Sequence, residues 1–242
     1  MTILCGFDIE STGLDKISDR PIELGVSIWT TKYNRNLDTR ALLIKSDGVP
    51  VTEEITEITG INQSMVDNFG YEPADAFDEM LYFMEQSEAL VAFNGRRFDV
   101  PMCQAWAKRV KKEFPNKLLI DPFTDLPMRG QELITMCAKM GIYYDPHEAG
   151  ADVGAMLRLV AKFDFQTVLE RAQSPIVVVR SMQHRDENNK AKKHKFRWNP
   201  DQQIWWKAVK ECDIDALAKA VNNEFALQVL DLQPEDLEDS KD

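Results

Sequence analysis

The segment Ile3–Gly13 (ILCGFDIESTG) constrains the fold more than any other part of the chain, because an apolar strand there ends in two carboxylates, Asp8 and Glu10. Residues i and i+2 of a strand project from the same face, so these acids are expected about 6–7 Å apart along the backbone on one side. Such a pair forms either a metal site or merely the polar end of a half-buried strand. Acidic partners elsewhere in the chain would favour the metal site.

Two later segments supply such partners. Residues 89–99 (ALVAFNGRRFD) contain a short apolar strand that breaks at an Asn-Gly pair and delivers Asp99 to the start of a helical pattern. Residues 145–152 (DPHEAGAD) place His147 in a loop and Asp152 in the first turn of a helix with apolar residues at i, i+3 and i+4 spacing. Strand ends and helix starts therefore carry every candidate acid.

Four carboxylates on one concave surface would repel each other by several kcal/mol at about 4 Å. Divalent cations relieve that repulsion, and Mg²⁺ and Mn²⁺ prefer oxygen ligands. Two such ions about 3.5–4 Å apart can stabilise the attacking and leaving oxygens of a displacement at phosphorus. His147 is the only histidine before residue 184, and an imidazole suits the role of proton acceptor at neutral pH.

The order of these motifs resembles the DEDDh group of 3'→5' exonucleases, the superfamily of the DNA polymerase III epsilon proofreading subunit. The resemblance spans about residues 3–165 and includes 20–25 (RPIELG) and Thr59, which stands where the family often has a histidine before Gly-Ile. The spacing from Asn94 to Asp99 is one residue longer than in most epsilon-like sequences and is similar to exonuclease I. The subfamily therefore stays open among epsilon-like, exonuclease I-like and exonuclease X-like members, phage members included.

The resemblance implies a role for each motif residue. Asp8, Glu10 and Asp152 would hold the metal that carries the nucleophilic water, with Asp8 bridging to a second ion held by Asp99. His147 would be the general base. The cofactor would be two Mg²⁺ ions, with Mn²⁺ able to substitute, and the product a nucleoside 5'-monophosphate. The expected substrate-binding residues around the terminal nucleotide are Ser11, Thr12, Gly13, Leu14, Thr59, Asn94 and Phe98.

The pattern of strands and helices predicts an α/β fold, a ribonuclease H-like mixed five-stranded sheet flanked by helices, with a small C-terminal α+β unit. Residues 1–172 would form the exonuclease domain. Residues 173–232 would form the accessory unit, with a basic polar turn at 184–195. Residues 233–242 are acidic and are expected to be disordered. The predicted strands are 2–10, 22–31, 37–45, 89–94 and 117–121, and the predicted helices are 73–86, 100–113, 129–140 and 150–163.

The net charge of −11 does not exclude a nucleic-acid substrate, because acids gather in the candidate metal site and the tail. In the accessory unit, cations alternate with tryptophans, a mixture that can hold single-stranded nucleic acid. The alternative is that the tryptophans form the core of this unit and the basic turn is only solvated. The candidate contacts to nucleic acid are Arg96, Arg97, Lys192, Lys193, Lys195, Arg197 and Trp198.

The sequence therefore predicts a metal-dependent 3'→5' exonuclease that acts on DNA, with single-stranded or frayed ends favoured. The alternatives are an RNA-trimming exonuclease and a proofreading or scaffold subunit that works with a polymerase or another replication protein; residues 228–232 (QVLDL) weakly resemble a clamp-binding peptide. No apolar run approaches the 18 or so residues of a membrane span, and no leader is expected before Ile3. Four dispersed cysteines are predicted to be reduced core thiols, which favours a bacterial cytoplasm, phage-infected or not.

Overall fold

The computed structural model describes residues 1–128 and 131–237, and the chain divides into two compact units, 1–172 and 173–242. Within the acidic segment 233–242, Pro234–Asp236 form a 3-10 turn, and Leu237 is buried. The rest of that segment, 238–242, lies outside the described residues. Among the described helices, none has both the length and the apolar character needed to cross a bilayer.

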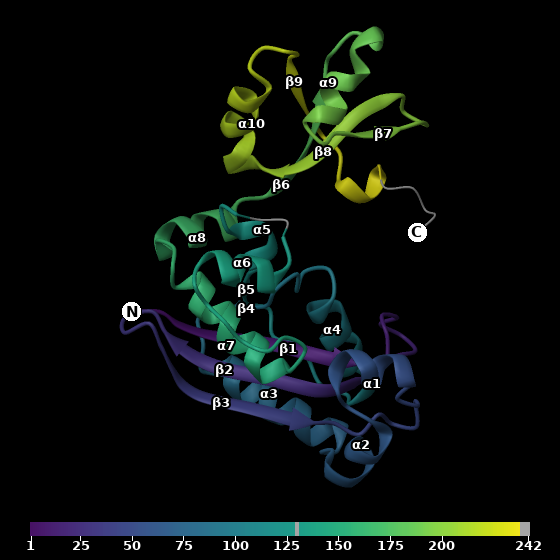
Figure 1. The fold of residues 1–242 in the computed structure, drawn as a ribbon, viewed down its shortest axis with the longest axis vertical. Coiled ribbons are helices and arrows are strands. Elements are labelled where there is room, and N and C mark those ends of the chain that lie inside the picture. The colour runs from purple at the N-terminus through teal and green to yellow at the C-terminus, as the bar shows by residue number, and fades with distance from the viewer. Residues whose placement is uncertain (129–130, 238–242) are drawn as a thin grey trace. The chain divides into compact units, whose positions relative to one another are not determined.

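The first unit is built on a mixed five-stranded sheet, as predicted, and the order of its strands is β3-β2-β1-β4-β5 (Figure 1). β1 pairs antiparallel with β2, and β2 pairs antiparallel with β3, whereas β1–β4 and β4–β5 are parallel. β1 therefore lies at the centre, where both neighbours fix the position of the acids it carries. The strands are β1 (Ile3–Ser11), β2 (Pro21–Thr30), β3 (Arg35–Leu43), β4 (Ala89–Val91) and β5 (Leu118–Ile120).

Helices cover both faces of this sheet because the side chains of β1 alternate between two cores. Phe7 belongs to the core that includes Phe77 and Trp106, from α3 (Pro73–Glu85) and α4 (Asp99–Arg109). Leu4 faces the opposite way, into the core formed by α6 (Leu133–Lys139) and α7 (Ala149–Val160). Burial of both apolar surfaces explains why strands and helices alternate in the second half of this unit. Four further helices were not predicted: α1 (Glu53–Thr59), α2 (Gln63–Phe69), α5 (Pro122–Asp125) and α8 (Phe165–Gln173).

A close approach between α7 and the sheet depends on Gly25 of β2. A Cβ atom at this position would lie 2.3 Å from the carbonyl carbon and oxygen of Ala149, at the start of α7. Backbone atoms cannot move aside as a flexible side chain can, so residue 25 must be glycine for the helix to begin this close to the strand. Gly25 is paired with Asp8 on β1, so the start of α7 lies beside the acidic end of that strand.

The second unit contains a four-stranded antiparallel sheet with the order β7-β8-β6-β9. The basic segment 184–195 is not simply a turn, because Asn188–Lys193 form the short helix α9, anchored by buried Ala191. The cysteine prediction also needs a correction: Cys212 is exposed, while the other three free thiols are buried. The strands and second helix of this unit are β6 (Ile176–Ser181), β7 (Arg197–Asn199), β8 (Ile204–Lys210), β9 (Leu227–Leu230) and α10 (Ile214–Val221).

Candidate active site

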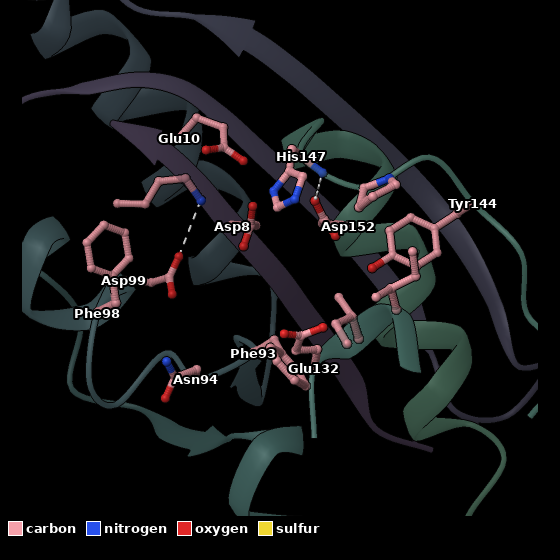
Figure 2. A pocket seen from close by; sticks show the side chains of 14 residues that line it. Asp8, Glu10, Phe93, Asn94, Phe98, Asp99, Glu132, Tyr144, His147 and Asp152 are labelled. Carbon is pink, nitrogen blue, oxygen red and sulfur yellow. Dashed lines mark hydrogen bonds between the residues drawn. The ribbon is translucent and has the colours of Figure 1, made fainter. Parts of the chain in front are cut away.

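The predicted motifs meet at a pocket of about 550 Å³ in the first unit. Figure 2 shows carboxylates from β1, from the start of α4 and from the first turn of α7 facing this space, with an imidazole beside them. The volume lies in the range of ordinary ligand sites. The lining residues are Asp8, Ile9, Glu10, Phe93, Asn94, Phe98, Asp99, Glu132, Leu133, Ile134, Tyr144, Pro146, His147 and Asp152.

Three of the acids are close enough to share one cation. Asp8, Glu10 and Asp152 each offer a carboxylate oxygen, and these oxygens all lie within 4.8 Å of one another. Strand alternation explains the first two, since they flank the buried Ile9 on β1. Asp99 lies nearby but is held differently: its Oδ1 accepts the backbone N–H of Ile9 at 3.3 Å. That bond ties the start of α4 to the strand between the other two acids.

The pKa values of these acids are raised, because the carboxylates are buried close to one another. Burial and then the charges of Asp99, Asp152 and Glu10 raise the pKa of Asp8 well above its ordinary value. Burial, followed by the charges of neighbouring acids, raises the pKa of Glu10 to about 8. Burial is also the main reason that the pKa of Asp99 rises to about 7. A divalent cation bound among these oxygens would offset the repulsion and favour the ionised carboxylates as its ligands.

His147 stands at the exposed rim of the pocket in an unusual backbone conformation. Its φ is +67°, in the left-handed region, and its backbone N–H donates to Oδ2 of Asp152 at 2.9 Å. A histidine adopts this region at a cost of about 1–3 kcal/mol, so the surrounding contacts must hold it. The result is an imidazole kept beside the acidic group.

A second acidic cluster, compensated by the cation of Arg96, holds the loop between β4 and α4. Asp121 accepts the backbone N–H groups of Asn94 at 2.8 Å and Arg96 at 3.2 Å. The Arg96 guanidinium in turn donates to the buried Asp125 at 3.1 Å and to the backbone carbonyl of Leu119 at 2.7 Å. This network fixes the loop that ends at Asp99.

Comparison with known proteins identifies the family. The family model named RNase_T, described as Exonuclease, matches residues 5–160, which is more than half of the chain. The chain belongs to this exonuclease family. A curated relative, the PolC-type DNA polymerase III of Caldanaerobacter subterraneus subsp. tengcongensis, is 34% identical over 116 residues, covering 47% of this chain. The match spans only 8% of the length of that relative.

Solved structures share the ribonuclease H-like exonuclease fold. Exonuclease I aligns with a TM-score of 0.62 at 14% identity, covering 98% of this chain and 66% of that chain. The nuclease domain of 3'hExo, a DEDDh family member bound to rAMP, aligns with a TM-score of 0.56 at 17% identity and covers 66% and 90% of the two chains. Exonuclease X in complex with 5' overhanging duplex DNA gives a TM-score of 0.51 at 15% identity, with 70% and 99% covered. DEDDh exonucleases depend on divalent metal ions, in keeping with the acidic cluster of this chain.

Within this family fold, the structure brings together seven of the predicted site residues. They come from three separate segments of the chain and line one pocket. Segments that lie far apart in the sequence therefore converge on this pocket. The seven are Asp8, Glu10, Asn94, Phe98, Asp99, His147 and Asp152.

Four of the predicted substrate-binding residues lie outside the pocket lining: Ser11, Thr12, Gly13 and Leu14. The Ser11 hydroxyl donates to the Gly13 carbonyl at 2.6 Å, and the Thr12 hydroxyl donates to Asp19 at 2.9 Å. Both side chains are buried, whereas Leu14 is 81% exposed. Thr59 also uses its hydroxyl locally, at the end of α1, where it donates to the Ile55 carbonyl at 2.9 Å. These hydroxyls stabilise turns in this structure.

The predicted cations fall into different environments. Arg96 belongs to the compensated cluster, whereas Arg97 is exposed. In the second unit, Lys193 pairs with Glu224 at 2.7 Å, and the Arg197 guanidinium lies 6.0 Å from the ring centre of Trp206. Lys195 is exposed, while Lys192 and Trp198 lie close to Trp205.

Sequence reasoning missed several residues of the site. Glu23 of β2 pairs with Glu10 across the strands, and its carboxylate accepts the backbone N–H of Ala149 at 2.9 Å, at the start of α7. Tyr144 and Glu132 line the pocket, and burial and the Asp152 charge raise the pKa of Tyr144. Glu23 could have been found from the strand pairing, since it lies in the segment that resembles the family. Glu132 carries no such signal in the sequence.

Proposed function

We propose that this protein is a two-metal-dependent 3'→5' exonuclease that hydrolyses terminal phosphodiester bonds of DNA and releases nucleoside 5'-monophosphates. The observation that carries this proposal is the group of three carboxylates within 4.8 Å of one another, beside an imidazole, in a family fold of exonucleases. Single-stranded or frayed ends fit best, because a terminal nucleotide has to enter a pocket of about 550 Å³. Free thiols, one of them exposed, support a reducing compartment such as the cytoplasm.

The acidic residues would divide the work of holding the ions. Asp8, Glu10 and Asp152 would hold one ion and Asp99 the other, with Asp8 shared between them. Two Mg²⁺ ions, or Mn²⁺ in their place, would supply a nucleophilic water and would stabilise charge on the phosphate oxygens. The Ile9 N–H bond to Asp99 keeps that carboxylate close to β1, so the two ligand sets stay near each other.

His147 would accept the proton of the attacking water. Its position at the pocket rim is held by the bond from its backbone N–H to Asp152, which is also a proposed ligand. The imidazole is exposed, so a proton it accepts can pass to bulk solvent. Positioned general bases of this kind contribute about 10²–10⁴-fold to a rate.

Phe93 and Phe98 form an aromatic part of the pocket wall. Aromatic rings stack with nucleobases of any sequence, so this wall fits the removal of each terminal nucleotide in turn. The same wall would accept ribonucleotides, and RNA trimming is therefore the second candidate function. The match to a PolC-type polymerase supports a third use, as a proofreading subunit beside a polymerase.

A gel assay with 3'-labelled and 5'-labelled oligonucleotides tests the proposal. The substrates are single-stranded DNA, single-stranded RNA, and DNA duplexes with a paired or a mismatched 3' end, each with magnesium or with EDTA. We expect single-nucleotide release from the 3' label, shortening ladders from the 5' label, and no reaction in EDTA. Degradation of RNA but not DNA would favour the trimming function, and a rate confined to mismatched ends would favour proofreading. Products longer than one nucleotide from the 3' end would contradict the proposal.

A further inference from the structure

The second unit carries a hollow of about 440 Å³ that the active site does not use. Its walls come from the end of β6, the start of α9 and the hairpin of β7 and β8. The lining residues that matter here are Arg180, Gln183, Asn188, Trp198 and Trp205. A cavity of this size is large enough for an aromatic ring with polar edges.

Two tryptophans form one wall of the hollow. Trp198 of β7 pairs directly with Trp205 of β8, and their ring centres are 5.6 Å apart at an interplanar angle of 50°. Trp198 is 46% exposed, in contrast to the neighbouring Trp206, which is 3% exposed and belongs to the core. The tryptophans of this unit therefore divide between core packing and an open ring surface, so core packing alone does not account for Trp198.

A hydrogen bond holds the Trp205 ring in place, and a lysine lies beside it. The Trp205 indole N–H donates to Oδ1 of Asn188 at 2.9 Å, and Lys192 Nζ lies 5.7 Å from the ring centre. The buried Oε1 of Gln183 has no hydrogen-bond partner among the described residues, although this side chain lines the hollow. Arg180 adds a guanidinium to the wall. A ligand with a flat ring, hydrogen-bonding edges and a nearby negative charge matches these features.

We infer that this hollow is a seat for one unpaired nucleobase of single-stranded nucleic acid, with the base stacked on Trp198. Arg180 and Lys192 are the cations placed to attract the adjoining phosphates. Lys193 is already paired with Glu224 and has no part in the seat. The inference rests on the proposed function only for the choice of nucleic acid as ligand. A duplex cannot use the seat, because its bases are stacked inside the helix.

A binding titration with the full chain tests this seat without any turnover. The background variant Asp8→Asn and EDTA prevent degradation of the probe, a fluorescein-labelled oligothymidylate of 20 nucleotides followed by anisotropy. Adding Trp198→Ala is expected to weaken binding about tenfold, because one stacked base is lost. Trp198→Phe is expected to recover most of the affinity, since a ring is restored.

The matched control is Tyr33→Ala, which removes an exposed aromatic ring from the first unit. Tyr33 is 64% exposed, and Lys32 Nζ lies 5.0 Å from the centre of its ring. This control, and a blunt duplex of 20 base pairs with either Trp198 variant, should show unchanged affinity. Equal affinity for the oligothymidylate with and without Trp198→Ala, in a variant with an unchanged melting temperature, would overturn the inference. Because binding is measured without turnover, a failure of the exonuclease proposal leaves this result readable.

Discussion

Two acidic clusters in the first unit show how partners decide what a carboxylate does. Asp121 and Asp125 are fully buried, and burial raises the pKa of Asp121, but the Arg96 guanidinium and backbone N–H groups oppose that rise. Asp8 and Glu10 face other acids, and their pKa values are raised by burial and by those charges. The first cluster is complete in the sense that it contains its own cation, and it holds a loop. The second is incomplete and requires protons or cations, as a metal site does.

Removing a charge from the incomplete cluster should have the largest effect on activity. Asp8→Asn is expected to lower turnover by more than the roughly 10²–10³-fold typical of losing one transition-state-stabilising donor, because Asp8 is the proposed ligand of both ions. The measurement is single-turnover hydrolysis of 3'-labelled DNA with saturating magnesium. Asp75→Asn, an exposed acid in the first turn of α3, is the matched control and should leave the rate unchanged. Turnover of Asp8→Asn at the control rate would refute the assignment of the site.

The imidazole beside the incomplete cluster should matter next. His147→Ala is expected to lower the rate by about 10²–10⁴-fold while metal binding is nearly unchanged, because the side chain is proposed to move a proton and not to hold an ion. Manganese titrations followed by electron paramagnetic resonance measure the binding, and rates from pH 6 to 9 measure the proton transfer. A variant that keeps the wild-type rate across this range would show that His147 is not the base.

Breaking the complete cluster should instead cost stability. Arg96→Met removes the guanidinium that bonds to the buried Asp125, and the loss of one partner of a buried pair costs about 3–5 kcal/mol in the free energy of unfolding. We expect the lower end of that range, because the Arg96 side chain is 29% exposed. Urea denaturation measures the change. Arg97→Met, at the exposed neighbouring position, is the control, and equal stability of the two variants would show that the ion pair does not hold the loop.

The smallest expected effect is the pH dependence of the metal-free protein. Glu10 and Asp99 have folded-state pKa values of about 8 and about 7, above those of an unfolded chain, so the folded protein binds more protons. Their stabilising contribution is present near pH 4 and is lost as the pH rises toward 8. In EDTA, the melting temperature at pH 8.5 should be lower than at pH 5.5. Magnesium at 100 times its Kd should raise the free energy of unfolding by about 2.7 kcal/mol.

The double variant Asp8→Asn/Glu10→Gln tests whether this pH dependence belongs to the incomplete cluster. It should show a flatter pH profile in EDTA and a smaller gain from magnesium. A metal-free wild-type protein that becomes more stable as the pH rises would contradict the proposed electrostatics. Together with Arg96→Met, these measurements distinguish acids that pair with a cation of the protein itself from acids that are proposed to bind metal ions.

The sequence predicted the sheet and the acidic group because both follow from local patterns. Strand alternation placed Asp8 and Glu10 on one face, and a change of periodicity placed Asp152 at the start of a helix. The roles of hydroxyls and cations could not be predicted in the same way, because they depend on partners distant in sequence or on loop geometry. Arg96 meets Asp125, 29 residues later, and Thr12 bonds across a loop to Asp19. The short helices α1 and α2 lack the long apolar repeat on which the prediction relied.

The contact between Gly25 and the start of α7 has a consequence for the chemistry. The helix can begin against β2 only because residue 25 has no side chain, and Asp152 follows Ala149 by three positions. A single methyl group there would push the helix outward and carry one carboxylate away from the two on β1. The spacing of the oxygens that would hold a cation thus depends on the absence of a side chain in a neighbouring strand, at a position outside the pocket lining.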